Sequence, residues 1–373
     1  MTGLMQLPVR TAVVGLGYFG RFHAKHYAAN TDADLVAVCD VDPARAADVA
    51  GEFGGAALSD YTLLPGTVDA VSITVPTSMH YEVARFFIEA GVHVLVEKPI
   101  TDDVADADRL VALAEEKGVV LQVGHIERFS AAFKALADKV TRPLFIESRR
   151  MSPWKPRATD VDVVLDLMIH DIDLVLGLVN SPVESLQALG APVLNASEDI
   201  ANARITFENG TVADITASRI AGKTDRQLRL FQIDNYLVCD FVDHRVSRFT
   251  RNAADSERNG DAGASGAATH GPNAIEMESW DIDREDSLGN EIAEFINCIA
   301  TDRRPTVDGR VGREALHVAT MITDSIRTHP PRLQASLAAG TQRRTPSGHV
   351  TTVPSTHLTP PTHCPLHTLR PHW

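Results

Sequence analysis

The sequence predicts an α/β protein made of a domain with a parallel sheet, followed by an α+β domain with an open, mainly antiparallel sheet. From Val9 to Val123, short apolar and β-branched runs alternate with helical segments, which is typical of a parallel sheet covered on both faces. Beyond Gly124, several β segments follow one another with hairpin-like turns, including Asn209-Gly210. That succession indicates an antiparallel sheet with helices on one face.

The first element reads as a strand, a tight turn and a helix. Val9, Ala12, Val13 and Val14 form a short apolar run, Gly15-Leu16-Gly17-Tyr18-Phe19-Gly20 turns the chain, and Arg21–Ala29 has a helical pattern. This is the dinucleotide-binding fingerprint of a Rossmann domain, in which the glycines permit the turn, admit a pyrophosphate and let the helix pack closely. The pyrophosphate then meets free N–H groups at a helix N-terminus.

A second strand, Asp34–Cys39, ends in Asp40, about twenty residues beyond the last glycine, where an acidic residue bonds the adenosine ribose. Its carboxylate would repel a phosphate on the 2′ position, so Asp40 favours NAD over NADP. The alternative is that Asp40 merely caps the helix that starts at Pro43.

The rest of this domain follows in order. Further helices are expected at Pro43–Phe53, Ser78–Ala90 and Thr101–Lys117, and further strands at Ala70–Val75, Val92–Val96 and Val119–Val123. The strand at Val92–Val96 places Glu97-Lys98-Pro99 at the carboxyl end of the sheet, where open α/β sheets bind ligands.

The second domain starts with a helix and a strand. We expect helices at 127–140 and 162–178, and strands at 144–150, 183–193, 200–207, 212–218, 227–233 and 236–241. The stretch 252–279 lacks an apolar pattern and is expected to be a disordered loop or a lid. Helices at 287–300 and 309–327 then pack back on the sheet or on the first domain. The predicted domains are 1–123, 124–330 and a disordered tail, 331–373.

Composition narrows the class of protein. A chain of 373 residues favours two domains, and a net charge of −14 argues against nucleic acid as a partner. No apolar run reaches the roughly 18 residues that a membrane span needs. We see no signal peptide, and the four scattered cysteines suit reduced thiols, so we expect a cytoplasmic protein.

Lys98 is the first candidate for chemistry. It follows a buried strand, and Glu97 and Pro99 fix its position. A lysine that is partly desolvated beside a cofactor can bond a substrate hydroxyl or accept its proton. The alternative is an ordinary surface lysine at the end of a strand.

Asp166, His170 and Asp173 are the second candidate. Their spacing of i, i+4 and i+7 places them on one face of a helix that is otherwise largely apolar. Histidine titrates near neutrality and suits proton transfer, while Asp166 can orient the imidazole or bond a sugar hydroxyl. A structural helix with capping acids and a metal site are alternatives, although we expect no metal because ligand-pair spacing is absent.

Together, the glycine-rich turn, Glu97-Lys98-Pro99, and Asp166 with His170 resemble the Gfo/Idh/MocA oxidoreductase family over about residues 8 to 330. The resemblance implies a Rossmann domain, a C-terminal domain whose open sheet mediates oligomers, and redox chemistry on sugars. It also implies that Lys98, Asp166 and His170 form the catalytic set.

Two further stretches, Val123–Phe129 and Thr159–Asp162, resemble the subgroup that oxidises the 3-hydroxyl of UDP-N-acetylglucosamine, often to prepare a 3-amino sugar for lipid A or surface polysaccharide. Many relatives in that subgroup have Asn and Pro where this chain has Ser130 and Ala131. A nucleotide sugar also needs cations for its diphosphate, and the nearest candidates are Arg128, Lys155 and Arg157.

We therefore predict an NAD-dependent sugar dehydrogenase that is a homodimer or homotetramer. The cofactor site is expected to contain Gly15, Gly17, Tyr18, Phe19, Gly20, Asp40, Pro76, Thr77, His80, Glu97 and Lys98. The substrate site is expected to contain His125, Arg128, Lys155, Arg157 and Asp173. A non-catalytic NAD-binding regulator and a dehydrogenase of a free sugar or inositol stay open as alternatives, as does the choice of Lys98 or His170 as proton acceptor.

Overall fold

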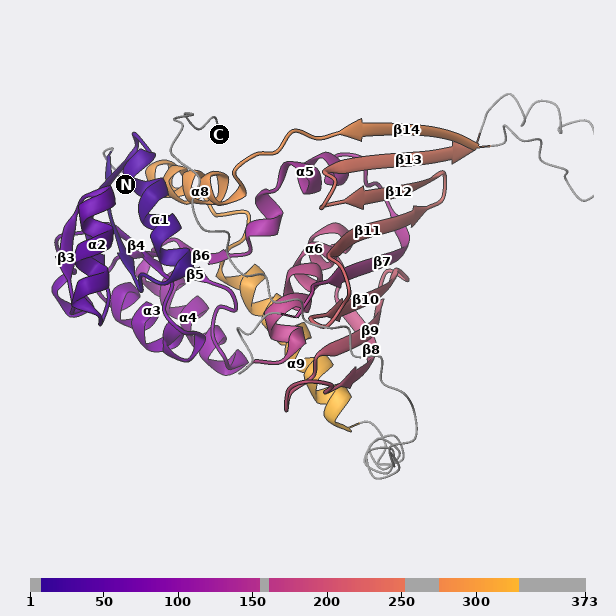
Figure 1. The fold of residues 1–373 in the computed structure, drawn as a ribbon, viewed down its shortest axis with the longest axis horizontal. Helices are drawn as coiled ribbons and strands as arrows, with labels where there is room; N and C mark the ends of the chain where they lie inside the picture. The colour runs from indigo at the N-terminus through magenta and orange to yellow at the C-terminus, as the bar shows by residue number, and fades with distance from the viewer. Residues whose placement is uncertain (1–7, 155–160, 252–274, 329–373) are drawn as a thin grey trace, which may run out of the picture. The chain divides into compact units, whose positions relative to one another are not determined.

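The computed structural model describes residues 8–154, 161–251 and 275–328, which all belong to one compact unit and form two sheets (Figure 1). The first sheet is six-stranded and parallel, with strand order β3-β2-β1-β4-β5-β6. The second is eight-stranded, with order β14-β13-β12-β11-β7-β10-β9-β8, and is antiparallel except where β7 pairs with β10. The predicted fold class is confirmed.

The first sheet and its helices follow the expected alternation. Its strands are β1 (Val9–Val14), β2 (Ala33–Cys39), β3 (Ala56–Leu58), β4 (Ala70–Ile73), β5 (His93–Glu97) and β6 (Leu121–Gly124). The α-helices are α1 (Tyr18–Ala29), α2 (Pro43–Phe53), α3 (His80–Glu89) and α4 (Val104–Lys117), with the short 3₁₀ turns η1 (Tyr61–Leu63) and η2 (Thr77–Met79). The edge strand β3 was not predicted, because three small, largely exposed residues carry no apolar pattern.

Capping residues set the helix limits that the apolar pattern placed only approximately. α4 starts three residues later than predicted because the Asp103 carboxylate accepts hydrogen bonds from the N–H groups of Ala105 and Asp106. It ends at Gly118, which is left-handed as expected. α1 starts at Tyr18 rather than Arg21, so the last glycine of the turn lies inside the helix.

The second sheet contains two strands that the sequence pattern did not predict. Its members are β7 (Pro143–Met151), β8 (Val183–Ala191), β9 (Ile200–Phe207), β10 (Val212–Ser218), β11 (Asp225–Gln232), β12 (Asn235–Asp240), β13 (Arg245–Arg251) and β14 (Ile275–Asp281). The prediction of a loop at 252–279 was wrong for its last residues, because β14 pairs with β13 from Ile275 onward. Residues 252–274, like the predicted tail, lie outside the described residues.

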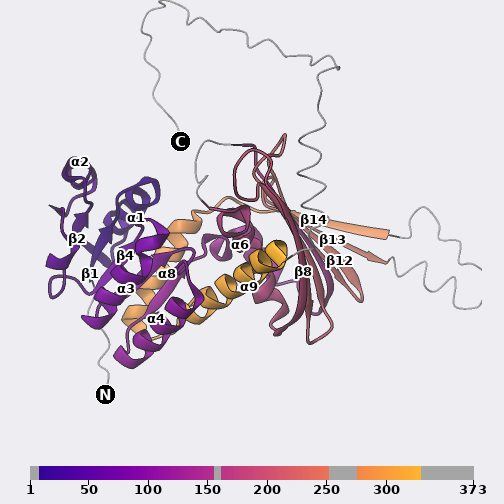
Figure 2. The same cartoon turned by 90° about the horizontal axis from the view of Figure 1, so that it is seen from below.

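Helices cover one face of this sheet, as Figure 2 shows for α6 and α9. The helical elements after β6 are η3 (Ile126–Phe129), α5 (Ala131–Ala137), the π-helix η4 (Val164–Met168), α6 (Ile169–Val179), α8 (Ser287–Thr301) and α9 (Gly309–Thr328). Ser130 splits the helix predicted at 127–140, because its hydroxyl caps α5 at the Phe133 N–H. α9 contacts both α4 and β8, and α8 packs on the first domain through Phe295.

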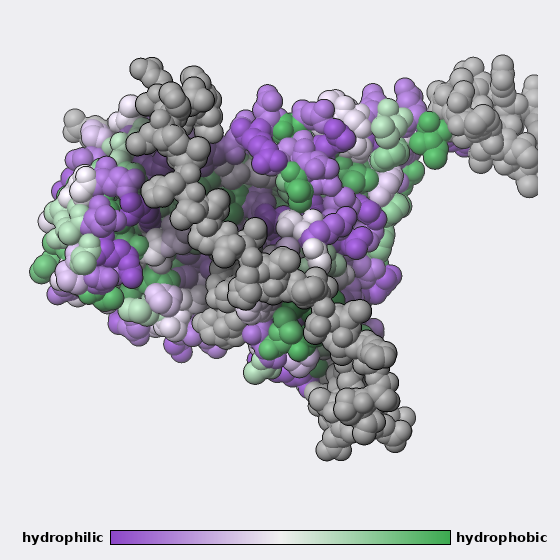
Figure 3. Space-filling model, in the orientation of Figure 1, coloured by the Kyte–Doolittle hydropathy of each residue, from purple (hydrophilic) through white to green (hydrophobic). Residues whose placement is uncertain are grey.

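The opposite face of the second sheet carries an aromatic row. Phe145, Phe231, Tyr236 and Phe249 are successive cross-strand partners, with ring centroids 5.5, 4.5 and 5.4 Å apart. Figure 3 shows hydrophobic surface near the tip of the β13–β14 hairpin, where Met277 is 61% exposed. Because Met277 pairs with Phe249 on the neighbouring strand, the row continues to this end of the sheet.

We predict that this face is buried in a homodimer or homotetramer. Light scattering at micromolar concentration is expected to give at least twice the chain mass of 40.4 kDa. Replacing an aromatic residue by a charge, as in Phe231→Glu, should shift the protein toward the monomer, because a buried unpaired carboxylate is costly. A wild-type monomer would contradict the prediction.

Candidate active site

The glycine-rich turn fits a dinucleotide. Gly15 has a φ of +89°, and a Cβ there would lie 2.7 Å from the Val75 nitrogen. A Cβ on Gly20 would collide with the Gly15 carbonyl oxygen, whereas nothing lies within 4 Å of a Cβ built on Gly17. Gly17 is also the N-cap of α1 and supplies no side-chain hydrogen bond. No side chain therefore occupies the space beside Gly17 at the N-terminus of α1, where a pyrophosphate would bind.

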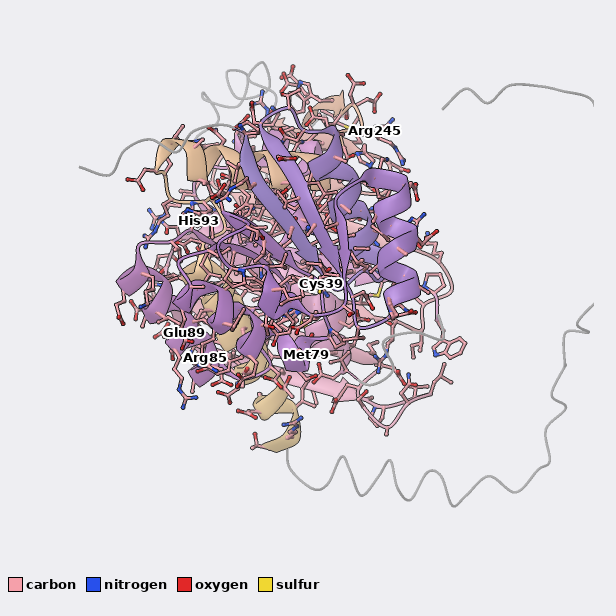
Figure 4. All side chains as sticks on the ribbon, turned by 90° about the vertical axis from the view of Figure 1, so that its left-hand side faces the viewer. Cys39, Met79, Arg85, Glu89, His93 and Arg245 are labelled. Atoms are coloured by element: carbon pink, nitrogen blue, oxygen red, sulfur yellow. The ribbon has the colours of Figure 1, made fainter. Side chains whose placement is uncertain are left out.

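Asp40 lies beside this turn, at the carboxyl end of β2. It directly follows Cys39, which Figure 4 labels. Its carboxylate accepts hydrogen bonds from the N–H groups of Leu16 (2.7 Å) and Asp42 (2.9 Å), and from Arg45 at 3.2 Å. Burial alone would raise the pKa of Asp40, but these bonds lower it below its ordinary value. The helix cap is Asp42, which accepts from Ala44, so Asp40 is not the cap of α2.

Asp40→Ser should narrow the preference for NAD over NADP. The substitution removes the charge that repels a 2′-phosphate and also releases Arg45, which can then bond that phosphate. We expect the ratio of kcat/KM with NAD to kcat/KM with NADP to fall by a factor that corresponds to about 1 to 3 kcal/mol, the size of a charged hydrogen bond. Equal kcat/KM with both cofactors in the wild type would contradict the assignment of Asp40.

Two of the predicted cofactor residues are committed to other contacts. The ring nitrogens of His80 lie 2.8 Å from the Pro99 carbonyl and 2.9 Å from the Val75 carbonyl, so its imidazole links the turns after β4 and β5. Glu97 points inward, where Oε1 lies 3.2 Å from His23 Nε2 and Oε2 accepts the Lys98 N–H. Both side chains therefore shape the turns. Tyr18 and Phe19 remain exposed beside the glycine turn, and contacts of Pro76 and Thr77 with the cofactor remain predictions.

Lys98 reaches from the first domain to the π-helix of the second. Its Nζ donates a hydrogen bond to the Asp166 carbonyl over 2.8 Å. The π-helix begins where the Asp162 carboxylate accepts from the N–H groups of Val164 (3.0 Å) and Leu165 (2.9 Å). A single α-helix was predicted over 162–178. The structure has the π-helix η4 followed by the α-helix α6, and a π turn holds more residues than an α turn.

His170 lies one turn beyond Asp166. Its Nδ1 is buried and has no hydrogen-bond partner among the described residues. Burial, followed by the charges of Lys98 and Arg150, lowers the pKa of His170 well below its ordinary value, so the imidazole is neutral and able to accept a proton. The structure thus brings together the three predicted catalytic residues.

Asp173 is engaged in a buried ion pair. Its carboxylate accepts from Arg128 Nε over 2.7 Å and Nη2 over 3.0 Å, and both side chains are largely buried. Gly177 makes room for this guanidinium, because a Cβ there would collide with it. Arg128 and Asp173 thus bond each other in the structure, and their role in substrate binding remains a prediction; Lys155 and Arg157 lie outside the described residues.

The sequence analysis missed Arg150. This residue is buried in β7 and bonds Glu127 at 2.8 Å and Asp171 at 2.5 Å, while the Ser148 hydroxyl donates to Asp171 over 2.6 Å. The alternation of β7 could have revealed it, because Arg150 stands in phase with the core residue Ile146.

His125 lies among buried polar side chains, and its role in substrate binding remains a prediction. It is 1% exposed, and neither ring nitrogen has a hydrogen-bond partner among the described residues. Asp173 is its nearest ion-pair partner, with Nδ1 and Oδ2 separated by 4.0 Å. Glu291 and Gln122 are fully buried as well, and the Gln122 amide donates to the Glu291 carbonyl over 3.1 Å. Burial, followed by the charge of Glu97, raises the pKa of Glu291 well above its ordinary value.

Glu291→Gln should stabilise the protein increasingly as pH rises. The native carboxyl keeps its proton above pH 4.5, where the unfolded chain loses it, so the free energy of unfolding of the wild type falls with pH. The amide has no proton to lose, and the two proteins should diverge by up to about 1.4 kcal/mol per pH unit. Urea unfolding between pH 4 and 8 measures this, and parallel curves would contradict it.

These features define a dinucleotide-binding protein whose redox site joins a Rossmann domain to an α+β domain. Residues 9–125 match the family model "Oxidoreductase family, NAD-binding Rossmann fold", and residues 123–232 match the GFO/IDH/MocA C-terminal domain. The chain belongs to the GFO/IDH/MocA family of NAD-binding oxidoreductases. In the part of the chain that the structure describes, no helix is long and apolar enough to cross a membrane.

Individual relatives share nearly the whole fold. The chain is 38% identical to UDP-N-acetylglucosamine 3-dehydrogenase of Acidithiobacillus ferrooxidans over 84% of this chain and 96% of that protein. A solved structure of the same enzyme, GnnA, aligns with a TM-score of 0.77 at 37% identity and covers 85% of this chain and 97% of its own. The chain is 32% identical to scyllo-inositol 2-dehydrogenase (NAD(+)) of Bacillus subtilis over 58% of this chain and 68% of that protein.

Proposed function

We propose that the protein is an NAD-dependent dehydrogenase that oxidises the 3-hydroxyl of UDP-N-acetylglucosamine to the 3-keto sugar. The observation that carries the proposal is the Lys98–Asp166–His170 arrangement at the end of β5, within a chain 38% identical to an enzyme of that name along almost its full length. The inositol dehydrogenases are less similar to this chain, as the 32% identity of scyllo-inositol 2-dehydrogenase (NAD(+)) over 58% of the chain illustrates, which makes inositol the weaker candidate.

The reaction removes a hydride and a proton from a carbinol and yields a ketone, NADH and H⁺. NAD, when bound, supplies the hydride acceptor. The glycine turn and Asp40 would hold the dinucleotide so that its redox end lies at the carboxyl end of the sheet. Lys98 would hold the reacting oxygen, and the proton passes to Lys98 or to the neutral imidazole of His170. A non-catalytic regulator would not need this acid–base pair.

Two finer points belong to the same proposal. We infer that the protein works in the cytoplasm, where NAD and UDP-sugars are available, and that the keto sugar is the substrate of an aminotransferase that makes a 3-amino sugar. The first is supported by three described cysteines that are all buried and free, as expected for a reducing compartment.

NADH absorbance over a panel of UDP-sugars and free inositols tests the function. We expect turnover with UDP-N-acetylglucosamine, increased by a keto-sugar aminotransferase that consumes the product. Turnover of inositol alone, or no turnover with any sugar despite NAD binding, would refute the proposal.

A further inference from the structure

Two arginines on the sheet side of His170 have no role in the reaction described above. Arg150 in β7 and Arg226 in β11 are direct cross-strand partners, so both side chains leave the sheet on its helix-covered face. Arg150 is held between Glu127 and Asp171, yet its Nη2 is buried and has no hydrogen-bond partner among the described residues. A buried guanidinium with an unused donor pair is costly unless a ligand completes it.

Arg226 is held less tightly. Its Nη1 lies 3.7 Å from Glu127 Oε1, longer than a hydrogen bond, and its side chain is 44% exposed. It lines a cavity of about 270 Å³ whose wall also includes His244 and Ser287. His244 Nδ1 is buried without a partner among the described residues, and Ser287 opens the 15-residue helix α8. The cavity therefore presents the Arg226 guanidinium beside an imidazole, a hydroxyl and the Glu127 carboxylate.

The same arginines act on the active site. After burial, the charges of Lys98, Arg150 and Arg226 all help to lower the pKa of His170. Cations thus approach the imidazole from both domains, because Lys98 follows β5 while both arginines stand in the second sheet. Glu127 and Asp171 offset part of this charge, but both are already bonded to Arg150. Of the two arginines, Arg226 is the less completely neutralised, because Glu127 lies 2.8 Å from Arg150 but 3.7 Å from Arg226.

We propose that Arg226, supported by Arg150, binds the diphosphate of the nucleotide-sugar substrate and so determines its specificity. The inference rests on the function proposed above. A guanidinium bonds phosphate oxygens in a bidentate manner, and the diphosphate is attached to the same sugar ring that presents its hydroxyl to Lys98 and His170. Arg128, the cation expected from the sequence, is already bonded to Asp173.

Arg226→Gln should raise the KM for UDP-N-acetylglucosamine about 10- to 100-fold, the loss of one charged hydrogen-bonding group, and should change kcat far less. Arg226→Lys should recover part of the loss. The control is Arg85→Gln, because Arg85 lies on the exposed surface of α3, where it pairs with Glu82 and Glu89. Equal KM values for wild type and Arg226→Gln would overturn the proposal.

Calorimetry with the NAD-loaded enzyme separates this inference from the function. UDP should bind the wild type more tightly than uridine, and Arg226→Gln should abolish most of that difference. Equal binding of UDP and uridine by the wild type would overturn the diphosphate site. If UDP binds through Arg226 but no UDP-sugar is oxidised, the proposed function fails and the site stands; if the sugar is oxidised and Arg226→Gln behaves as wild type, only the site fails.

Discussion

Lys98→Met is expected to lower kcat by about 10²- to 10⁴-fold, the usual contribution of a positioned acid–base group, while NAD still binds. The cofactor is held by the glycine turn and Asp40, which the substitution does not touch. The loss follows from geometry. The Lys98 N–H donates a hydrogen bond to the Glu97 carboxylate, and the Lys98 Nζ donates one to the Asp166 carbonyl within the π-helix η4. Stopped-flow or steady-state NADH formation measures turnover, and fluorescence titration measures NAD binding.

His170→Asn should also lower turnover, by about a hundredfold or more. The double variant should be little slower than the slower single variant, because residues that act as one unit are not additive. Lys117→Met, an exposed lysine in the last turn of α4, is the matched control and should behave as wild type. Turnover of a UDP-sugar by Lys98→Met within a few-fold of wild type would remove catalysis from this site and favour the regulator.

Asp173→Ala is expected to lower the free energy of unfolding by about 3 to 5 kcal/mol, because it leaves the Arg128 guanidinium buried without its carboxylate. Asp173 is 1% exposed and accepts two hydrogen bonds from Arg128, so water cannot replace the lost partner. Urea unfolding at fixed protein concentration measures the change.

Glu89→Ala provides the control for this loss. Glu89 pairs with Arg85 at 2.8 Å on the surface of α3, where the two side chains are 48% and 38% exposed, so the loss should stay within about 1 kcal/mol. If Asp173→Ala instead kept wild-type stability and raised only the KM for the sugar, Asp173 would be a substrate ligand after all.

The sequence by itself determined the features that depend on local pattern. The alternation of buried strands and helices predicted the parallel sheet, and the spacing of Gly15, Gly17 and Gly20 predicted the cofactor turn, because the three glycines form a short contiguous motif that is visible in the sequence. The motif Glu97-Lys98-Pro99 and the pair Asp166 with His170 were found in the same way. The strand β14 was not predicted, because its alternation of Ile275 and Met277 with glutamates is short and follows a long polar stretch.

Only the tertiary structure decided which charges are available for chemistry. Arg128 and Asp173 are 45 residues apart in sequence and become each other's partners, whereas Arg150 and Arg226 become neighbours through strand register. The π-helix η4 is also contacted by a distant segment of the chain, because the Lys98 Nζ donates a hydrogen bond to the Asp166 carbonyl. A charged side chain has the same sequence signature whether it meets a ligand or an opposite charge, because its partner is chosen by packing between segments that are distant in the chain.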